Sequence, residues 1–235
     1  MTMIENRNSE AGSLLEGAIG VIGRAETLFF EARKSQPDTV REIYGQMNLP
    51  APATRQRYYN WNCTGMNYVR VESSIAIPGR EVTTLFIKNR EGIWDVRPKH
   101  AVEVSTIFKR DELLGTFPFL RLYAIPRYPY ELHVDSAYGS IDQIVVKGRL
   151  KTKPIHCSED IANEASYAID RKSMRLRSLN EKTFGGRSLN LNFERLSTNE
   201  TMDGKLFDLP DTPRVVVSSL KEYLDLRQRE SLNSF

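Results

Sequence analysis

The sequence predicts an α+β protein in which an N-terminal helix precedes a long antiparallel sheet. Apolar residues recur at helical spacing over residues 14–32, and from residue 39 onwards the apolar–polar period changes to two. Glycine and proline separate the resulting short runs, as is typical of strands joined by turns. Because no repeat or low-complexity linker divides the chain, we expect one domain at 14–217. A disordered tail is expected at 1–13, and a C-terminal helix and tail at 218–235.

The N-terminal helix begins with a capping box. Ser13 is the expected N-cap and Glu16 follows three residues later. Gly17, Gly20 and Gly23 lie inside the helix and each destabilises it by about 1 kcal/mol relative to alanine. We therefore expect tertiary packing to support this helix, with the glycines letting it lie close to the sheet. The apolar stripe consists of Leu14, Leu15, Ala18, Ile19, Ile22, Ala25, Leu28, Phe29 and Ala32.

The strands follow in two groups. The first group includes a hairpin whose turn residue is Gly92, and a middle segment at 110–123, interrupted by Pro118, is expected to form short helical turns or a lid-like loop. Residues 207–210 are expected to be extended and 218–230 to be helical. The strands are predicted at 40–45, 55–61, 67–73, 81–88, 93–97 and 101–104, and then at 141–150, 165–169, 174–179 and 188–196.

Apolar residues occupy both faces of the expected sheet. Leu85 and Phe86 are consecutive and must point in opposite directions, as must Ile93 and Trp94. Both faces are therefore expected to be covered. A curved sheet that is open on one side would form an apolar cleft, which is the default ligand site of such a fold. Trp94 is expected to pack in the core, on the concave or helix-facing side of its hairpin, and secondarily to line the cleft.

The motifs of catalysis and metal binding do not occur in the sequence. His100, His133 and His156 are scattered, whereas a metal site needs convergent ligands. There is no HExxH, GxSxG, P-loop or dinucleotide-binding pattern. Carboxylate pairs such as Glu159-Asp160 lie in polar segments, where solvated charges are expected. We therefore expect a protein that is not an enzyme and that uses no cofactor and no metal.

Charge and hydropathy exclude two classes of partner. Lys and Arg number 33 against 30 Asp and Glu, for a net charge of +3, so a nucleic-acid partner is not expected. No apolar run reaches the length of a membrane span. The first 13 residues lack the pattern of a signal peptide, so the chain is either cytoplasmic or the mature part of an exported protein. Cys63 and Cys157 either pair in an oxidising compartment or remain buried free thiols.

Three features occur in an order that suggests a family. An amphipathic N-terminal helix leads directly into strands. Residues 68–72 (YVRVE) then precede 84–96 (TLFIKNREGIWDV), which places a strand with a central arginine before a hairpin with a glycine turn, an aromatic residue and an acid. The late strands at 167–193 are followed by 206–210 (LFDLP). Over residues 14–212 the chain thus resembles the LolA-like superfamily of periplasmic lipoprotein carriers and lipid-binding proteins.

The resemblance implies a strongly bent antiparallel sheet that forms an unclosed half-barrel, covered by the N-terminal helix and by short helices or a lid. It implies a periplasmic location if a signal peptide has been removed, and otherwise the compartment stays open. Arg70 matches an arginine that lies inside the carrier's cavity and helps to hold its lid closed. Two departures from the carriers are the missing signal peptide and the helix at 218–230. Because glycolipid carriers and sensor domains also have this fold, the fold alone does not determine which of these functions the protein has.

Binding of an apolar ligand without catalysis is the leading hypothesis. The ligand is a lipid or the acyl chains of a lipoprotein, and each buried methylene contributes about 0.8 kcal/mol. The alternative is an interaction or sensor module with an envelope protein as partner, whose cleft is filled by its own side chains. A basic ribbon of Arg171, Lys172, Arg175 and Arg177 fits that alternative. The candidate ligand-binding residues are Arg70, Leu85, Phe86, Trp94, Phe117 and Phe119.

Overall fold

The computed structural model describes residues 3–34, 38–49, 51–52, 54–77, 80–105, 107, 132–150, 162–183 and 188–232. Four helical elements lie within these ranges: α1 (Met3–Arg24), α2 (Asp38–Gln46), the short 3-10 helix η2 (Gly204–Phe207) and α5 (Leu220–Leu232). The strands are β1 (Thr27–Lys34), β2 (Thr54–Cys63), β3 (Met66–Ile77), β4 (Arg80–Asn89), β5 (Gly92–Val96), β6 (Ala101–Glu103), β7 (Leu132–Gly139), β8 (Gln143–Leu150), β9 (Ala162–Asp170), β10 (Leu176–Thr183), β11 (Ser188–Thr198) and β12 (Arg214–Val216).

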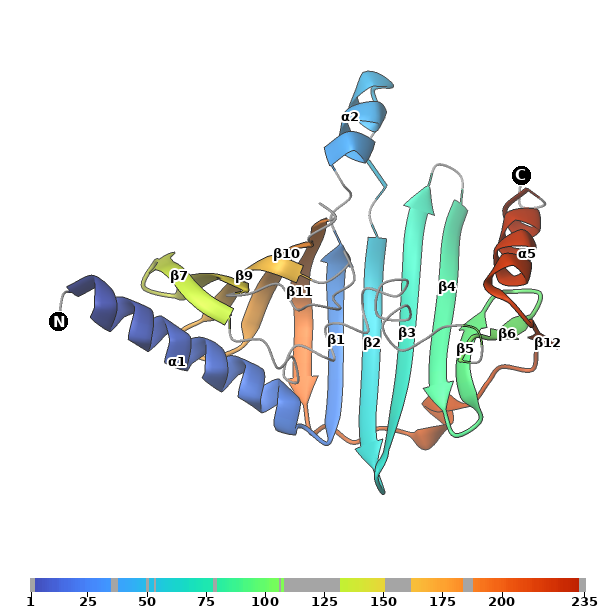
Figure 1. Cartoon of the computed structure of the whole chain (residues 1–235), viewed down its shortest axis with the longest axis horizontal. Helices are drawn as coiled ribbons and strands as arrows, with labels where there is room; N and C mark the ends of the chain where they lie inside the picture. Colours follow the sequence, from blue (N-terminus) through green and yellow to red (C-terminus); the bar gives the residue numbers. More distant parts are fainter. Residues whose placement is uncertain are drawn as a thin grey trace.

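One twelve-stranded sheet connects all of these strands (Figure 1). Its order is β12-β6-β5-β4-β3-β2-β1-β11-β10-β9-β8-β7, and β12–β6 is its parallel pair. The sheet does not close on itself, because β12 and β7 lie at opposite ends of this order. The predicted fold class, an α+β protein with an unclosed antiparallel half-barrel, is confirmed.

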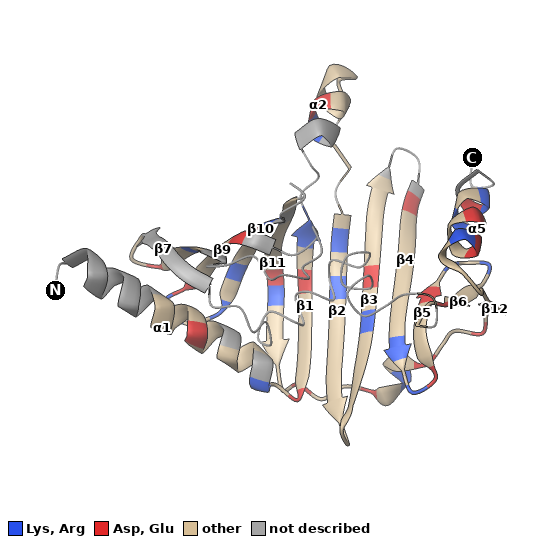
Figure 2. Ribbon diagram, viewed as in Figure 1, with Lys and Arg blue, Asp and Glu red and all other residues tan. Residues whose placement is uncertain are grey.

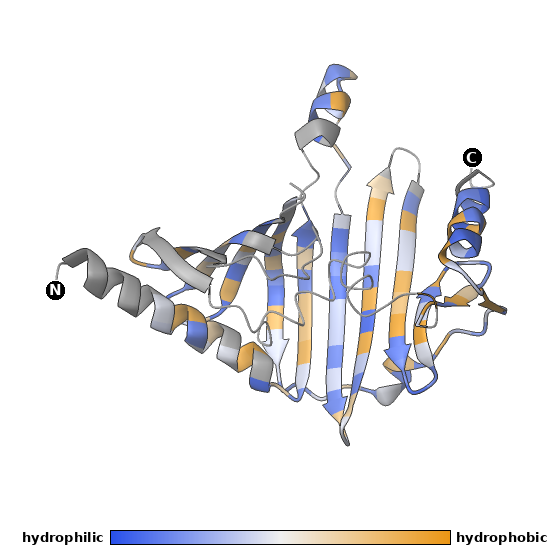
Figure 3. Ribbon diagram, viewed as in Figure 1, coloured by the Kyte–Doolittle hydropathy of each residue, from blue (hydrophilic) through white to orange (hydrophobic). Residues whose placement is uncertain are grey.

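The two faces of the sheet differ in composition. We call the face that carries Phe30, Tyr58, Val71 and Phe86 the core face, because these residues are cross-strand neighbours and all of them are buried. We call the opposite face the outer face. Because successive side chains of a strand point in opposite directions, neighbouring residues along each strand belong to opposite faces. Figure 3 shows this alternation as hydrophobic and hydrophilic bands along β3 and β4.

Two helices cover the core face towards its ends. Helix α1 packs against β7, β8 and β9, with Leu15 and Ala18 buried in the main core. A β-carbon at Gly17 would lie 3.4 Å from Cε of Met174 in the β9–β10 turn, so the helix does approach the sheet closely at this glycine, as expected. Helix α5 packs at the other end, where Tyr223 joins the same core. Strands β1 to β4 lie between the two helices (Figure 1).

The N-terminal helix differs from the prediction at both ends. It begins at Met3, so that residues 3–13 are helical where a tail was expected, and it ends at Arg24 instead of continuing to residue 32. Residues 27–34 form β1 instead. The reason is that Leu28, Phe30 and Ala32 also fit a period of two, and in the structure all three point to the core face.

Residues 40–45 were predicted to be a strand and form α2 instead. Val40, Ile43, Tyr44 and Met47 are spaced as i, i+3, i+4 and i+7, which fits a helix as well as the short alternation fits a strand. Of the extended segment expected at 207–210, Phe207 belongs to η2, which Asp203 caps by accepting a hydrogen bond from the Lys205 backbone N–H. Strands β7 and β12 were not predicted. The expected lid at 110–123 lies outside the described residues.

The remaining strands, the β4–β5 hairpin and the C-terminal helix are confirmed, with shifts of a few residues at their ends. Gly92 is the turn residue of the hairpin and has a φ of 147°, a backbone conformation that favours glycine. The β2–β3 turn uses Thr64 and Gly65, with φ values of 50° and 78°. Two consecutive positive φ angles are the signature of the tight turns that join adjacent strands.

Candidate functional site

The middle of the core face is an apolar surface that extends across four strands. The rings of Phe30 and Tyr58 stack with their centroids 4.8 Å apart, and Phe193 meets Phe30 edge-on at 5.3 Å. Val71 and Phe86 continue the row on β3 and β4, and only 4% of the Phe86 surface is exposed. All four residues of this row belong to the main hydrophobic core.

The apolar row becomes polar towards one end of the strands. We call the core-face residues Lys34, Thr54, Gln56, Ser73 and Thr84 the polar end; their strands pair with one another in register. The Gln56 amide donates to Oγ of Ser73 at 3.2 Å, and the Thr84 hydroxyl donates to the Ser73 carbonyl at 3.4 Å. This end lies towards α2 (Figure 1). It combines hydrogen-bonding groups with an adjoining apolar surface.

Apolar side chains at the same end are partly open to solvent. Ile75 is paired with Thr54 on one side and with Val82 on the other. Ile75 is half-buried and Val82 is 37% exposed, whereas Phe86 further along β4 is buried. The core face is therefore more accessible at the polar end than in its middle.

Lys34 is the cation of the polar end. Its cross-strand neighbours are Thr54 on β2 and Leu191 on β11, both of them buried. The side chain is half-buried, and this burial lowers the pKa of its ammonium group. No carboxylate within the described ranges forms an ion pair with it. Among the described residues, Lys34 is therefore a cation without an ion pair, and it lies beside the buried Leu191.

The outer face of the same strands carries a row of ion pairs. Figure 2 shows the Lys and Arg bands and the Asp and Glu bands on these neighbouring strands. Glu31 accepts from Arg55 at 2.8 Å and from Arg57 at 2.9 Å, and the hydrogen bond from Arg57 is the main reason why the Glu31 pKa is lowered. Arginine and carboxylate side chains alternate across four strands, so the charges largely neutralise one another. The outer-face ion-pair row consists of Arg33, Glu194, Arg55, Glu31, Arg57, Glu72 and Arg70.

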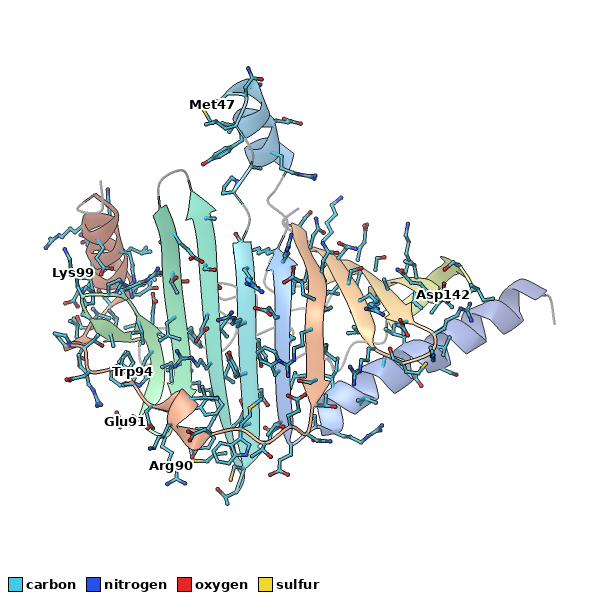
Figure 4. The ribbon with its side chains drawn as sticks, turned by 180° about the vertical axis from the view of Figure 1, so that it is seen from behind. Met47, Arg90, Glu91, Trp94, Lys99 and Asp142 are labelled. Carbon is cyan, nitrogen blue, oxygen red and sulfur yellow. The ribbon has the colours of Figure 1, made fainter. Side chains whose placement is uncertain are left out.

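The structure separates the apolar candidates predicted from the sequence. Phe86 lies on the core face, whereas Leu85 and Trp94 lie on the outer face in a second, smaller cluster. Trp94 was expected on the concave or helix-facing side, but it lies on the face away from α1 and α5 (Figure 4). It is nevertheless buried, as expected, and the guanidinium of Arg214 lies 5.5 Å from its ring centroid. Phe117 and Phe119 lie outside the described residues.

Arg70 also lies on the outer face. Its Nε donates to Glu72 at 2.7 Å, and one of its terminal nitrogens donates to the backbone carbonyl of Leu206 at 2.9 Å. Leu206 belongs to η2, so Arg70 connects β3 to a segment that follows it by more than a hundred residues. This contact lies on the opposite face of the sheet from Phe86.

Two open pockets occur on the described surface. One, of about 340 Å³, lies between β8 and β11 and has a polar lining that includes Lys147, Glu164 and Lys182. The other, of about 330 Å³, lies where η2 covers the ends of β2 and β3. Its floor is formed by Trp61 and Tyr68, whose ring centroids are 5.5 Å apart. Neither pocket belongs to the polar end.

A buried polar network holds α5 against β5. The Tyr223 hydroxyl donates to Asp95 at 2.7 Å, and Arg227 forms an ion pair with the same carboxylate at 2.7 Å. Burial, followed by the Asp95 charge, raises the pKa of Tyr223 to about 12. Arg227 also pairs with Glu230, which lies 3.2 Å from Nε2 of His100. This network is structural, because its groups are occupied with one another.

The other predicted residues have the following places. Cys63 is a free, half-buried thiol, and Cys157 lies outside the described residues. Within the described ranges, no group of three or more His, Cys, Asp and Glu could hold a metal ion. None of the helices described here is long and apolar enough to span a membrane. Sequence reasoning missed Lys34, because the helical spacing of residues 14–32 concealed the strand to which Lys34 belongs.

No family model and no curated protein matches the chain. Several solved structures do match. An uncharacterized conserved protein from Thermus thermophilus is 11% identical, with 88% of this chain and 99% of that chain covered and a TM-score of 0.49. In a MucA/MucB complex from Pseudomonas aeruginosa, the matched chain is 7% identical, with 86% and 61% covered and a TM-score of 0.45.

A third match is a LolA superfamily protein from Nitrosomonas europaea. It is 12% identical, with 85% of this chain and 97% of that chain covered and a TM-score of 0.38.

Proposed function

We propose that this protein binds an apolar ligand, the acyl chains of a lipid or lipoprotein, against the core face of β1 to β4, without catalysing a reaction. The observation that carries the proposal is the apolar row of Phe30, Tyr58, Val71 and Phe86, which leads to partly exposed apolar side chains at the polar end. Each methylene buried there contributes about 0.8 kcal/mol, so a chain of ordinary lipid length binds without a reactive group.

In this proposal the ligand enters the core face at the polar end. Val82 and Ile75 are the first apolar side chains that it meets, and Phe86 lies further along the same face. Phe117 and Phe119 stay proposed contacts. Arg70, Leu85 and Trp94 remain predictions of the sequence, and their position on the outer face favours a role in holding η2 and the segment after it.

A pair of neighbouring substitutions tests the proposal. Val82→Asn changes an exposed core-face residue, whereas Thr83→Asn changes the next residue along β4, which is exposed on the outer face. We expect Val82→Asn to weaken binding of a fluorescent fatty-acid probe about threefold, since it removes apolar contact area at the entrance. Thr83→Asn is expected to bind as the unaltered protein does. Equal affinities of the two variants, or no binding of the probe at all, would contradict the proposal.

A protein-interaction module is the second candidate. The observation that favours it is the β9–β10 turn, where Arg171, Lys172 and Arg175 are exposed. Arg177 pairs with Asp170 at 2.6 Å and is less available to a partner. A protein that stays bound after delipidation and is released by Arg175→Glu would favour this candidate. The partner in that case is an envelope protein, and cell fractionation tests the periplasmic location that goes with either candidate.

A further inference from the structure

Lys34 lies on the core face and forms no ion pair with a carboxylate among the described residues, whereas Lys88, a cation of β4 on the same face, donates to the Asn67 side chain at 3.4 Å. We propose that Lys34 binds the anionic head group, a carboxylate or phosphate, of an amphiphile whose chain lies on the core face. This inference rests on the proposed function and adds to it the chemical class of the ligand.

Strand geometry places the ammonium group of Lys34 at the boundary between apolar and polar surface. Ala32, two residues earlier, is fully buried on the same face, and Arg33 between them points to the outer face and pairs with Glu194. The cross-strand neighbours of Lys34 are Leu191, which is apolar, and Thr54, which belongs to the polar end. A head group at Lys34 therefore leaves its acyl chain directed along the apolar row.

Electrostatics favours an anion at this place. A half-buried ammonium group has lost part of its hydration, and without a paired charge this loss is not compensated. An anion in contact with it restores the compensation, and the attraction is stronger there than in bulk water because the surroundings are partly apolar. Burial also lowers the pKa of Lys34, which is the direction expected for a cation without a partner.

The arginines of the outer face cannot take the same role. Glu31 and Glu194 neutralise Arg33 and Arg55, and Glu72 neutralises Arg70. An anion that approached those arginines would have to compete with carboxylates that are already in contact. Among the described residues no carboxylate is in contact with Lys34, so an anion that binds there displaces none.

The test compares two ligands that share one chain length, palmitate and hexadecanol, in competition with a fluorescent fatty-acid probe. The unaltered protein is expected to bind palmitate about tenfold more tightly than hexadecanol. Lys34→Met is expected to abolish this preference while leaving the affinity for hexadecanol unchanged. Lys34→Arg is expected to retain the preference, because it keeps the charge. The matched control is Arg33→Met, which removes a cation from the adjacent position on the outer face and is expected to retain the preference too.

Each outcome bears on a separate claim. If neither ligand binds, the proposed function itself is wrong. If the unaltered protein binds palmitate and hexadecanol equally, or if Lys34→Met still prefers palmitate, the proposed acyl site is retained and the assignment of Lys34 is wrong. Acetate and inorganic phosphate are each added alone as competitors. If either displaces the probe at millimolar concentration, the site binds free anions, and the proposal that its ligand is an amphiphile is wrong. Thermal unfolding checks that Lys34→Met is folded, and its Tm is expected to be at least as high as before, since an unpaired half-buried charge is removed.

Discussion

Arg33 and Lys34 are consecutive residues of β1 with the same formal charge and opposite surroundings. Arg33 points to the outer face and pairs with Glu194, within a row of arginines and carboxylates that crosses four strands. Lys34 points to the core face, beside Leu191 and Thr54, and has no counter-ion among the described residues. Two adjacent cations of one strand thus differ in whether a carboxylate of the described residues already neutralises them.

The largest expected effect tests whether charges buried on the core face depend on their partners. Asp95 is a core-face residue, and Arg227 of α5 pairs with it at 2.7 Å. Arg227→Met leaves the buried Asp95 carboxylate with Arg97 as its cation, at 3.2 Å, and also removes the ion pair of Arg227 with Glu230, so the free energy of unfolding is expected to fall by about 2 kcal/mol. Urea denaturation measures this change. A loss below about 1 kcal/mol would mean that Arg97 and solvent suffice to compensate Asp95.

The pH dependence of stability tests the other partner of Asp95, the Tyr223 hydroxyl. The pKa of Tyr223 is raised to about 12, so the protonated hydroxyl is favoured in the folded protein. Its contribution to stability is fully present below about pH 10, the ordinary tyrosine pKa, and is lost as the pH rises towards 12. Tyr223→Phe is expected to lose about 1 kcal/mol at neutral pH, where the hydrogen bond to Asp95 is missing.

Between pH 10 and 12 the same variant is expected to lose less stability than the unaltered protein. Urea denaturation at a series of pH values gives the dependence of the unfolding free energy on pH for both proteins. The same dependence in both would show that groups other than Tyr223 determine the stability in the alkaline range.

The smallest effect is expected on the outer face. Glu31→Gln removes a carboxylate that contacts Arg55 and Arg57, but both arginines are largely exposed. Exposed ion pairs contribute at most about 1 kcal/mol, and salt screens them. The Glu31 pKa is lowered, so its contribution is present above its ordinary pKa near 4.5 and is lost as the pH falls below it.

Thermal unfolding with and without 1 M NaCl checks this expectation. The difference between Glu31→Gln and the unaltered protein is expected to shrink in salt. A difference that exceeds that of Arg227→Met, or that persists in salt, would reverse the comparison between the two faces.

The sequence predicted the sheet better than the site. Strands β2 to β5 have long alternating runs, which determine which residues share a face within each strand. Leu85 and Phe86 were therefore known to point in opposite directions, yet their assignment to the core or the outer face needs the pairing with β3 and β5, which no single strand contains. The contact of Arg70 with Leu206 spans too many residues for any local pattern to show it.

Lys34 shows most clearly what the pattern left undetermined. Apolar residues at 28, 29 and 32 continue the helical stripe of α1, so the helix was expected to reach residue 32, two residues before Lys34. In the structure the helix ends at Arg24 and the same residues form a strand, because alternate side chains from 28 to 32 pack against β2 and β11. Tertiary pairing, not local spacing, decided between the two interpretations.

Photo-crosslinking with a diazirine-bearing palmitic acid, followed by residue-level mass spectrometry, locates the bound acyl chain on one face of the sheet. Adducts are expected on core-face residues of the central strands, such as Ile75, Val82 and Phe86, and are expected to disappear when unlabelled palmitate is added in excess. Adducts confined to outer-face residues such as Leu85 and Trp94, or labelling that palmitate does not reduce, would contradict the proposed function.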